Sequence, residues 1–323
     1  MRVSICVPTA SASRAGFLRE AIESAASQTY SNFEIVLGDN STDPVHHAFV
    51  DRLMGEFPQL EFRLLRHPVR LLAEENFNAT ADAAHGDAIV FLPDDDLLCP
   101  SFLERAVAAL ERHPECGLTF ADHWLINERS EVDVSGTDAN TVRYKRDALQ
   151  EGVYPHASLF HLALNQALCL QTMLIRREVM LANKFPVGVL SGDFAFGLKV
   201  SAGKTGIHAY YLKERVFKYR VHGAMISSSL QSRRSLEGLI RCMEECGTVP
   251  EACLTEYREK LGGRYLALSL SEAEAGDATA SKHALQGLKL SPSIRHALVA
   301  TVSVALPWTV APIRRMRAAL RRS

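Results

Sequence analysis

Three consecutive aspartates, Asp94, Asp95 and Asp96, form the segment of this chain that most directly suggests chemistry. They follow residues 88–92, an apolar run with the length of a buried strand. Adjacent carboxylates repel and raise each other's pKa, and a bound cation removes that repulsion. Because Mg²⁺ and Mn²⁺ prefer carboxylate oxygens and often share substrate phosphates, the run predicts a metal site for a phosphorylated ligand. An exposed turn of helix-capping aspartates is the alternative.

Alternating strand and helix patterns occupy the first third of the chain and position this run. Apolar, β-branched runs predict strands at residues 3–7, 33–37, 61–65 and 88–92. Amphipathic spacing predicts helices at residues 14–28, 44–57, 74–84 and 101–112. This order is typical of an α/β fold, with helices on both faces of a parallel sheet. Since ligands of such sheets bind beyond the carboxyl ends of the strands, we expect the site at residues 8–13, 38–43 and 93–96.

Several classes of function are disfavoured by composition and by missing motifs. The net charge of -1 over 323 residues gives no basic surface of the kind that nucleic-acid binders show. Residues 8–13 contain neither the dinucleotide-binding glycines nor a P-loop. The seven cysteines are scattered, which favours reduced core thiols in a cytosolic protein over disulfides.

The remaining residues give a looser pattern. It predicts a strand at 118–121, a polar surface excursion at 127–147, a strand and then a helix from 174, a helix at 192–202, and two strands at 209–212 and 216–221. From residue 230 onward the sequence predicts helices. Residues 261–290 are expected to form two helices, separated at Gly276 and Asp277.

Four segments, taken in order, resemble inverting glycosyltransferases of family 2. Residues 91–98 resemble the DxD segment of that family. Residues 4–9, 18–30 and 34–43 are similar to its first strand and nucleotide-binding loop, its first helix, and the segment that contacts the base. The resemblance implies an α/β fold of GT-A type, a Rossmann-like mixed sheet flanked by helices, with a helical C-terminal region. The implied domains are residues 1–225, with a nucleotide-binding half (1–115) and an acceptor half (116–225), and residues 226–323.

The resemblance also implies roles for the residues at the ligand edge. The family pattern reads Asp-x-Asp-Asp, and Pro93 stands at its first position, so by this alignment Asp95 is the principal ligand of Mn²⁺ or Mg²⁺. Asp94 and Asp96 also form an Asp-x-Asp, so the division of roles among the three aspartates stays open. Asp96 is then a supporting carboxylate and metal ligand, and Asp94 lies near the metal or the ribose. The remaining residues implied in nucleotide-sugar binding are Pro8, Thr9, Ala10 and Asp39.

Asp39 is expected to accept a hydrogen bond from the base. Uracil, thymine and guanine all offer a ring N–H, so UDP-, dTDP- and GDP-sugars stay open as donors. An Asx turn before Asn40 is the alternative role for this carboxylate.

The resemblance places a catalytic base and a further metal ligand in the second half of the first domain. Residues 190–196 are similar to the family's Glu-Asp segment, with Gly192 replacing the glutamate and Asp193 at the position of the base. A carboxylate there can take a proton from an acceptor hydroxyl, and a helix N-cap is the alternative role. Residues 219–223 resemble a Tyr-Arg-x-His segment, in which His222 ligates the metal or contacts the diphosphate and Arg220 neutralises phosphate charge.

The tail, residues 295–323, contains six arginines and no acidic residue around an apolar run that includes Trp308. This composition fits an anchor on an anionic membrane surface, and equally a packed helix with a solvated basic end. Residues 1–8 do not resemble a signal peptide, and no unbroken apolar stretch reaches the length of a transmembrane helix. We therefore expect a cytoplasmic protein and leave open a peripheral position at the inner face of the membrane.

The sequence thus predicts a metal-dependent inverting glycosyltransferase that moves a sugar from a nucleotide-sugar to a saccharide or lipid-linked acceptor. A role in cell-surface polysaccharide or glycolipid biosynthesis follows from that interpretation. Two alternatives stay open: a nucleotidyltransferase, and a catalytically silent nucleotide-sugar-binding module. The N-terminal loop, residues 8–13, has neither the glycine nor the lysine that nucleotidyltransferases usually have there. The sequence has no Gln-x-x-Arg-Trp motif, which argues against a processive synthase.

Overall fold

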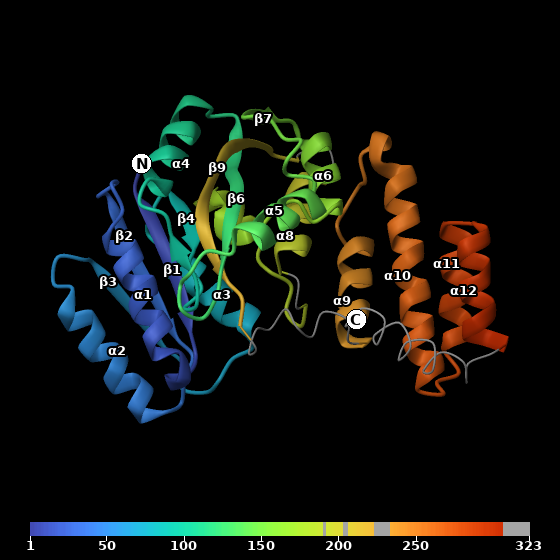
Figure 1. The fold of residues 1–323 in the computed structure, drawn as a ribbon, viewed down its shortest axis with the longest axis horizontal. Coiled ribbons are helices and arrows are strands. Elements are labelled where there is room, and N and C mark those ends of the chain that lie inside the picture. Colours follow the sequence, from blue (N-terminus) through green and yellow to red (C-terminus); the bar gives the residue numbers. More distant parts are fainter. Residues whose placement is uncertain (190–191, 203–205, 223–232, 306–323) are drawn as a thin grey trace. The chain divides into compact units, whose positions relative to one another are not determined.

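The chain divides into two compact units in a computed structural model (Figure 1). The first contains the described residues of 1–188 and 192–225, and the second those of 189–191 and 226–323. The roles predicted for the two halves of the first unit stay predictions. The structure describes residues 1–189, 192–202, 206–222 and 233–305.

A single sheet of nine strands forms the centre of the first unit, as far as its described residues go. The strands are β1 (Val3–Thr9), β2 (Phe33–Asp39), β3 (Phe62–Arg66), β4 (Ala88–Phe91), β5 (Leu97–Leu98), β6 (Cys116–Ile126), β7 (Gly152–Tyr154), β8 (Leu174–Arg176) and β9 (His208–Arg220). Their order is β3-β2-β1-β4-β8-β6-β9-β5, and β7 also pairs with β9. The first four are parallel, as predicted, whereas β8 is antiparallel to both β4 and β6. The sheet is therefore mixed, which confirms the predicted fold class.

Helices flank this sheet, and Figure 1 shows α1 and α2 beside its β1–β3 side. They are α1 (Ala15–Ala26), α2 (Pro44–Glu56), α3 (Ala73–Ala83), α4 (Phe102–Arg112), α5 (Val134–Arg143), α6 (His156–Leu164), α7 (Arg177–Ala182) and α8 (Gly192–Ser201). Helix α1 buries Leu18, Ala21, Ile22 and Ala25, one stripe at helical spacing, in the main core. All seven cysteines are free thiols, as predicted, and six of them are buried.

Two segments differ from the sequence prediction. The strands predicted at 209–212 and 216–221 are one continuous strand, β9, because the polar residues 213–215 stay in the strand. The pairing with β6 shifts register at residues 213 and 214 and resumes at Arg215, opposite Asp122. The excursion predicted at 127–147 contains helix α5. Its N-cap is Asp133, whose side chain accepts from the Gly136 N–H, and it buries Thr137 and Thr141. A buried face made of threonines escapes a search for apolar periodicity.

The second unit is helical, as predicted: α9 (Arg233–Glu244), α10 (Leu254–Glu274), α11 (Ala280–Leu290) and α12 (Ile294–Ala305). Leu266, Ala284 and Ala300 form a core shared by the last three helices. Gly262 and Gly287 allow α10 and α11 to approach closely, since a Cβ at either glycine would lie 2.8 Å from the other's carbonyl oxygen. In the described part of the chain, no helix has the length and apolarity needed to cross a membrane. Most of the predicted tail anchor, residues 306–323, lies outside the described residues.

A buried carboxylate joins three segments at the amino end of the sheet. Glu34 on β2 accepts from Ser4 Oγ at 2.7 Å and from the His85 N–H at 2.6 Å. Arg2 and Arg63 lie 3.5 and 3.7 Å from its other oxygen. Burial raises the pKa of Glu34, but the hydrogen bonds and the two arginines outweigh burial and hold that pKa below its usual value. Glu34 is thus a charged group that ties the turn before β4 to β1 and β2.

Replacing Glu34 by leucine is expected to lower the free energy of unfolding by about 2–4 kcal/mol, since it leaves buried donors without an acceptor. Urea denaturation at pH 7 measures this. The difference from wild type should shrink as the pH falls through the lowered pKa of the folded state, where wild-type Glu34 itself becomes neutral. Glu61→Leu is the control, because Glu61 is an exposed partner of Arg2 and its loss should change stability little. Equal losses in both variants would contradict the prediction.

Candidate functional site

The carboxyl ends of several strands bring the predicted loops to one edge of the sheet. Thr9 ends β1 and is paired with Asp39 at the end of β2. Strand β4 ends at Phe91, directly before the acidic run. Strand β9 runs in the same direction and ends at Arg220, so His222 reaches the same edge. The edge expected from the strand order therefore gathers Thr9, Asp39, the acidic run and His222.

The three aspartates of the run lie in three different environments. Asp94 and Asp96 are buried, with 2% and 1% of their surfaces exposed, whereas the Asp95 side chain is 16% exposed. Asp94 accepts from Thr9 Oγ at 2.7 Å and from the Ala10 N–H. Burial and the neighbouring Asp95 raise the pKa of Asp94 to about 6. Asp94 thus links the acidic run to the loop after β1.

Asp96 is held by the end of β9. Its Oδ1 accepts from the Arg220 N–H at 2.8 Å, and burial and the charge of Asp95 raise its pKa well above the usual value. The Arg220 side chain donates Nε–H to the Asp95 carbonyl at 2.7 Å and Nη2–H to Glu20 at 2.7 Å. That guanidinium is fully buried and engaged with the protein, so it braces the acidic turn and is not available to a phosphate in this arrangement.

Asp95 faces His222 across the edge. The distance from Asp95 Oδ2 to His222 Nε2 is 3.0 Å. Two adjacent ligands of an octahedral ion with bonds of about 2.1 Å lie about 3.0 Å apart, so this spacing suits a shared Mg²⁺ or Mn²⁺. Arg14 Nη1 lies 3.5 Å from the same Asp95 oxygen and 3.3 Å from Asp94 Oδ1.

These donors fit a cation that is shared with a ligand. Among the residues that the structure describes, no group of three or more His, Cys, Asp or Glu side chains could hold a metal ion. Mg²⁺ usually keeps waters and binds through one or two carboxylates plus substrate phosphates, so an ion beside Asp95 and His222 would need further ligands from the substrate and from water. Asp96 Oδ1 already accepts a hydrogen bond from the Arg220 N–H. The metal roles of all three residues stay predictions.

Asp39 lies fully buried beneath this edge. Its Oδ1 accepts from the Ser41 N–H at 3.1 Å, and Arg66 Nε lies 3.3 Å from Oδ2. The first contact has the geometry of the Asx turn that was the alternative role. A carboxylate has about four acceptor positions, so these contacts leave room for a hydrogen bond from a base. The predicted contact with the base stays a prediction.

Asp193 lies in the first turn of α8. It is half-buried, and its Oδ1 accepts from the Phe194 N–H at 2.8 Å. Burial raises the pKa of Asp193. Burial also raises the pKa of the Cys169 thiol, and the negative charges of Asp193 and Asp96 raise it further. The role of Asp193 as the catalytic base stays a prediction.

Sequence reasoning missed two residues at this edge. Arg14 contacts two aspartates of the run. Its position in the sequence, as a lone cation directly after the ligand-facing loop 8–13, could have identified it. His46 on α2 is fully buried, with Nε2 at 3.4 Å from Thr9 Oγ and 3.6 Å from Asp39 Oδ1. Burial lowers the pKa of His46, so it is a neutral bridge between the β1 and β2 loops. No motif marks it in the sequence.

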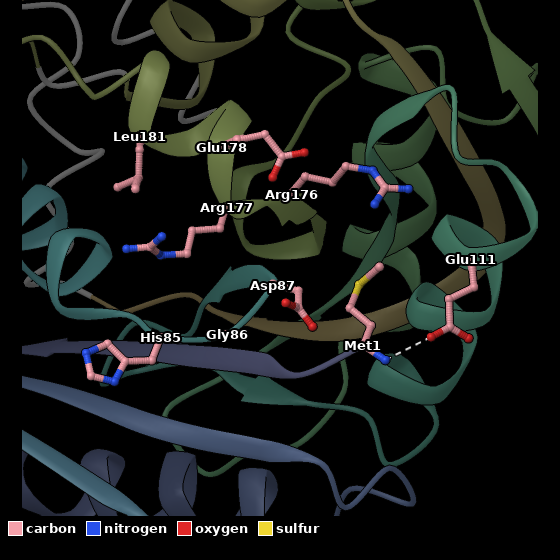
Figure 2. A pocket seen from close by; sticks show the side chains of 9 residues that line it. All are labelled: Met1, His85, Gly86, Asp87, Glu111, Arg176, Arg177, Glu178 and Leu181. Atoms are coloured by element: carbon pink, nitrogen blue, oxygen red, sulfur yellow. Dashed lines mark hydrogen bonds and ion pairs between the residues drawn. The ribbon is translucent and has the colours of Figure 1, made fainter.

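A pocket of about 830 Å³ lies elsewhere, at the amino ends of β1 and β4 (Figure 2). It contains none of the predicted site residues. Figure 2 shows a mixture of acidic and basic side chains, with Met1 N bonded to Glu111 at 2.9 Å. The pocket is lined by Met1, His85, Gly86, Asp87, Glu111, Arg176, Arg177, Glu178 and Leu181.

Comparison with known families identifies the family to which this chain belongs. The family model described as "Glycosyl transferase family 2" matches residues 4–178, more than half of the chain. This chain belongs to glycosyltransferase family 2. An uncharacterised glycosyltransferase of Haemophilus influenzae is 25% identical over 76% of this chain and 72% of its own length. The O-antigen biosynthesis protein RfbC of Myxococcus xanthus is 32% identical over 37% of this chain. The chain spans only 9% of RfbC and 14% of a matched Sinorhizobium fredii protein.

Similar solved structures confirm the fold. S. aureus TarS in complex with UDP-GlcNAc has a TM-score of 0.58 and 15% identity, and the match covers 97% of this chain and 82% of TarS. The mannosyltransferase PcManGT of Pyrobaculum calidifontis, in complex with GDP-Man and Mn²⁺, has a TM-score of 0.60 and 18% identity, with 98% and 87% covered. The predictions of a family 2 glycosyltransferase and of a GT-A-type fold are confirmed.

Proposed function

We propose that this family 2 protein transfers a sugar, with inversion, from a nucleotide-sugar to a hydroxyl of a saccharide or lipid-linked acceptor. The observation that carries the proposal is the pair Asp95 and His222, 3.0 Å apart at the ligand edge although 127 positions apart in the chain. The complexes of TarS with UDP-GlcNAc and of PcManGT with GDP-Man and Mn²⁺ support it.

Different residues of the ligand edge bind different parts of the donor. Asp95 and His222 would hold Mn²⁺ or Mg²⁺ against the diphosphate, and the ion would offset the charge that develops on the departing nucleoside diphosphate. Asp94 fixes the end of β1 and the loop that follows it, where Pro8, Thr9 and Ala10 line the nucleotide pocket. Asp39, supported by Arg66, accepts from the base.

Asp193 performs the proton transfer. A sugar hydroxyl is a poor nucleophile, and a carboxylate that takes its proton during attack makes it a better one. The raised pKa of Asp193 makes its carboxylate more basic than that of an exposed aspartate. Attack from the face opposite the diphosphate forms the new C–O bond as the old one breaks, which inverts the anomeric centre.

The direct test is thermal stabilisation of the full chain by UDP, GDP and dTDP, each with and without Mn²⁺ or Mg²⁺. A ligand at a hundred times its Kd stabilises the fold by about 2.7 kcal/mol, which is several degrees in Tm. We expect one nucleotide to raise Tm substantially only when the metal is also present. If none of the three nucleotides gives a metal-dependent rise in Tm, the proposal is wrong.

We also propose cell-surface polysaccharide or glycolipid biosynthesis as the setting. The similarity to an O-antigen biosynthesis protein supports this, and so does the basic composition of residues 295–323, which suits an anionic membrane surface.

A further inference from the structure

Arg14 is a cation beside the acidic run at the ligand edge of the sheet. The proposed function gives it no role. It lies at the start of α1, and its side chain is 24% exposed. Its Nη1 is 3.3 Å from Asp94 Oδ1 and 3.5 Å from Asp95 Oδ2. Within the described part of the chain, no other arginine or lysine forms an ion pair with either carboxylate.

The position of Arg14 conflicts with a metal on Asp95. The oxygen that Arg14 contacts, Asp95 Oδ2, is also the one that faces His222 at 3.0 Å. A divalent ion between Asp95 and His222 would bring two cations to one carboxylate oxygen, and like charges repel. An ion bound there would therefore compete with Arg14 for Asp95.

Asp94 limits where Arg14 can go. Asp94 is buried and fixed by Thr9, so it can retain the guanidinium at the edge after Asp95 is lost as a partner. A nucleoside diphosphate bound to the ion brings phosphate oxygens to this place. A guanidinium offers a planar set of five N–H donors that suits phosphate, and Arg14 is partly exposed, unlike the fully buried Arg220.

We propose that Arg14 is a switching residue that neutralises Asp95 in the empty enzyme and binds the donor diphosphate when the metal displaces it. This inference rests on the proposed function, because it needs both a metal and a diphosphate. A switching Arg14 would affect binding in a way that a purely structural arginine would not. Removing Arg14 should make metal binding tighter, since a competing cation is gone, and should make diphosphate binding weaker, since a phosphate ligand is gone.

The experiment compares wild type with Arg14→Gln and Arg14→Lys. Mn²⁺ alone is titrated first, with free Mn²⁺ followed by electron paramagnetic resonance. UDP, GDP or dTDP, whichever stabilises the wild type, is then titrated in saturating Mn²⁺ by calorimetry. Arg19→Gln is the matched control, because it removes the same charge from α1, the helix that Arg14 precedes, but from an ion pair with Glu56. Melting temperatures report on folding.

We expect Arg14→Gln to bind Mn²⁺ at least about threefold more tightly and the diphosphate about tenfold more weakly. Arg14→Lys should lie between Arg14→Gln and wild type, and Arg19→Gln should match wild type. Unchanged affinities, or a loss of both together, would overturn the role of Arg14. A wild type without metal-dependent nucleotide binding would instead overturn the proposed function, and the inference with it.

Discussion

Replacing Asp193 by asparagine is expected to reduce the transfer rate about 10³-fold and to leave donor binding within a few-fold of wild type. A positioned general base contributes about 10²–10⁴-fold, and an amide cannot take the proton. The amide oxygen can still accept from the Phe194 N–H, so the first turn of α8 should survive the substitution. Initial rates with saturating donor measure the first effect, and calorimetric titration with the nucleoside diphosphate measures the second.

The control for Asp193→Asn is Asp133→Asn, which changes another aspartate at a helix start, the N-cap of α5. Asp133→Asn should keep full activity. Because burial raises the pKa of Asp193, the wild-type rate should fall on acidification through a pKa above the ordinary aspartate value of about 3.9. Unchanged transfer in Asp193→Asn would remove Asp193 as the base. Transfer absent even from wild type, with donor binding intact, would favour the silent binding module.

The sheet edge that carries the site could be predicted from the sequence because it depends on local patterns. Strands β1, β2 and β4 are short apolar runs, and each is followed by polar residues. The carboxyl ends of parallel strands meet at one edge, so Asp39 and the acidic run had to come together once these strands were identified. The strong amphipathic pattern of α4 and the buried stripe of α1 made their helices equally easy to place.

The parts that could not be predicted depend on contacts between distant segments. Whether Asp94 or Asp95 faces outward is decided by Thr9 and Arg220, which lie 85 and 125 positions from their partners. Arg14 gave only a weak signal, a lone cation beside an acidic edge. His46 gave none, because a buried polar side chain in a helix looks like any other break in its apolar stripe. The contacts of such residues can be recognised only when the positions of the neighbouring strands are known.

The antiparallel insertion of β8 between β4 and β6 is a second example. Its three residues carry too little pattern to reveal direction, yet they place β6 and β9 in line with the first strands. This placement is what brings His222 to Asp95. The contact between Asp95 and His222 is thus a property of the topology and not of the acidic motif alone.

Asp95→Asn is expected to weaken Mn²⁺ binding by at least about tenfold and to lower transfer about 10³-fold, since the ion stabilises the leaving group by several kcal/mol. The substitution keeps the shape of the side chain and removes the charge that would hold the ion. It should not disturb the fold, because the carbonyl of residue 95, not its side chain, accepts from Arg220 Nε. Raising the Mn²⁺ concentration should restore part of the activity, which a collapsed site would not allow.

Asp87→Asn is the matched control for Asp95→Asn, because Asp87 is exposed at the opposite, amino end of the sheet. It should bind Mn²⁺ and transfer sugar as the wild type does. The effect on Mn²⁺ should also be opposite in sign to that of Arg14→Gln, since one variant removes the ligand and the other removes its competitor. A loss of activity in Asp95→Asn that no Mn²⁺ concentration restores, together with unaltered Mn²⁺ affinity, would show that Asp95 is not a metal ligand, and the pairing of Asp95 with His222 would then have to be a structural contact.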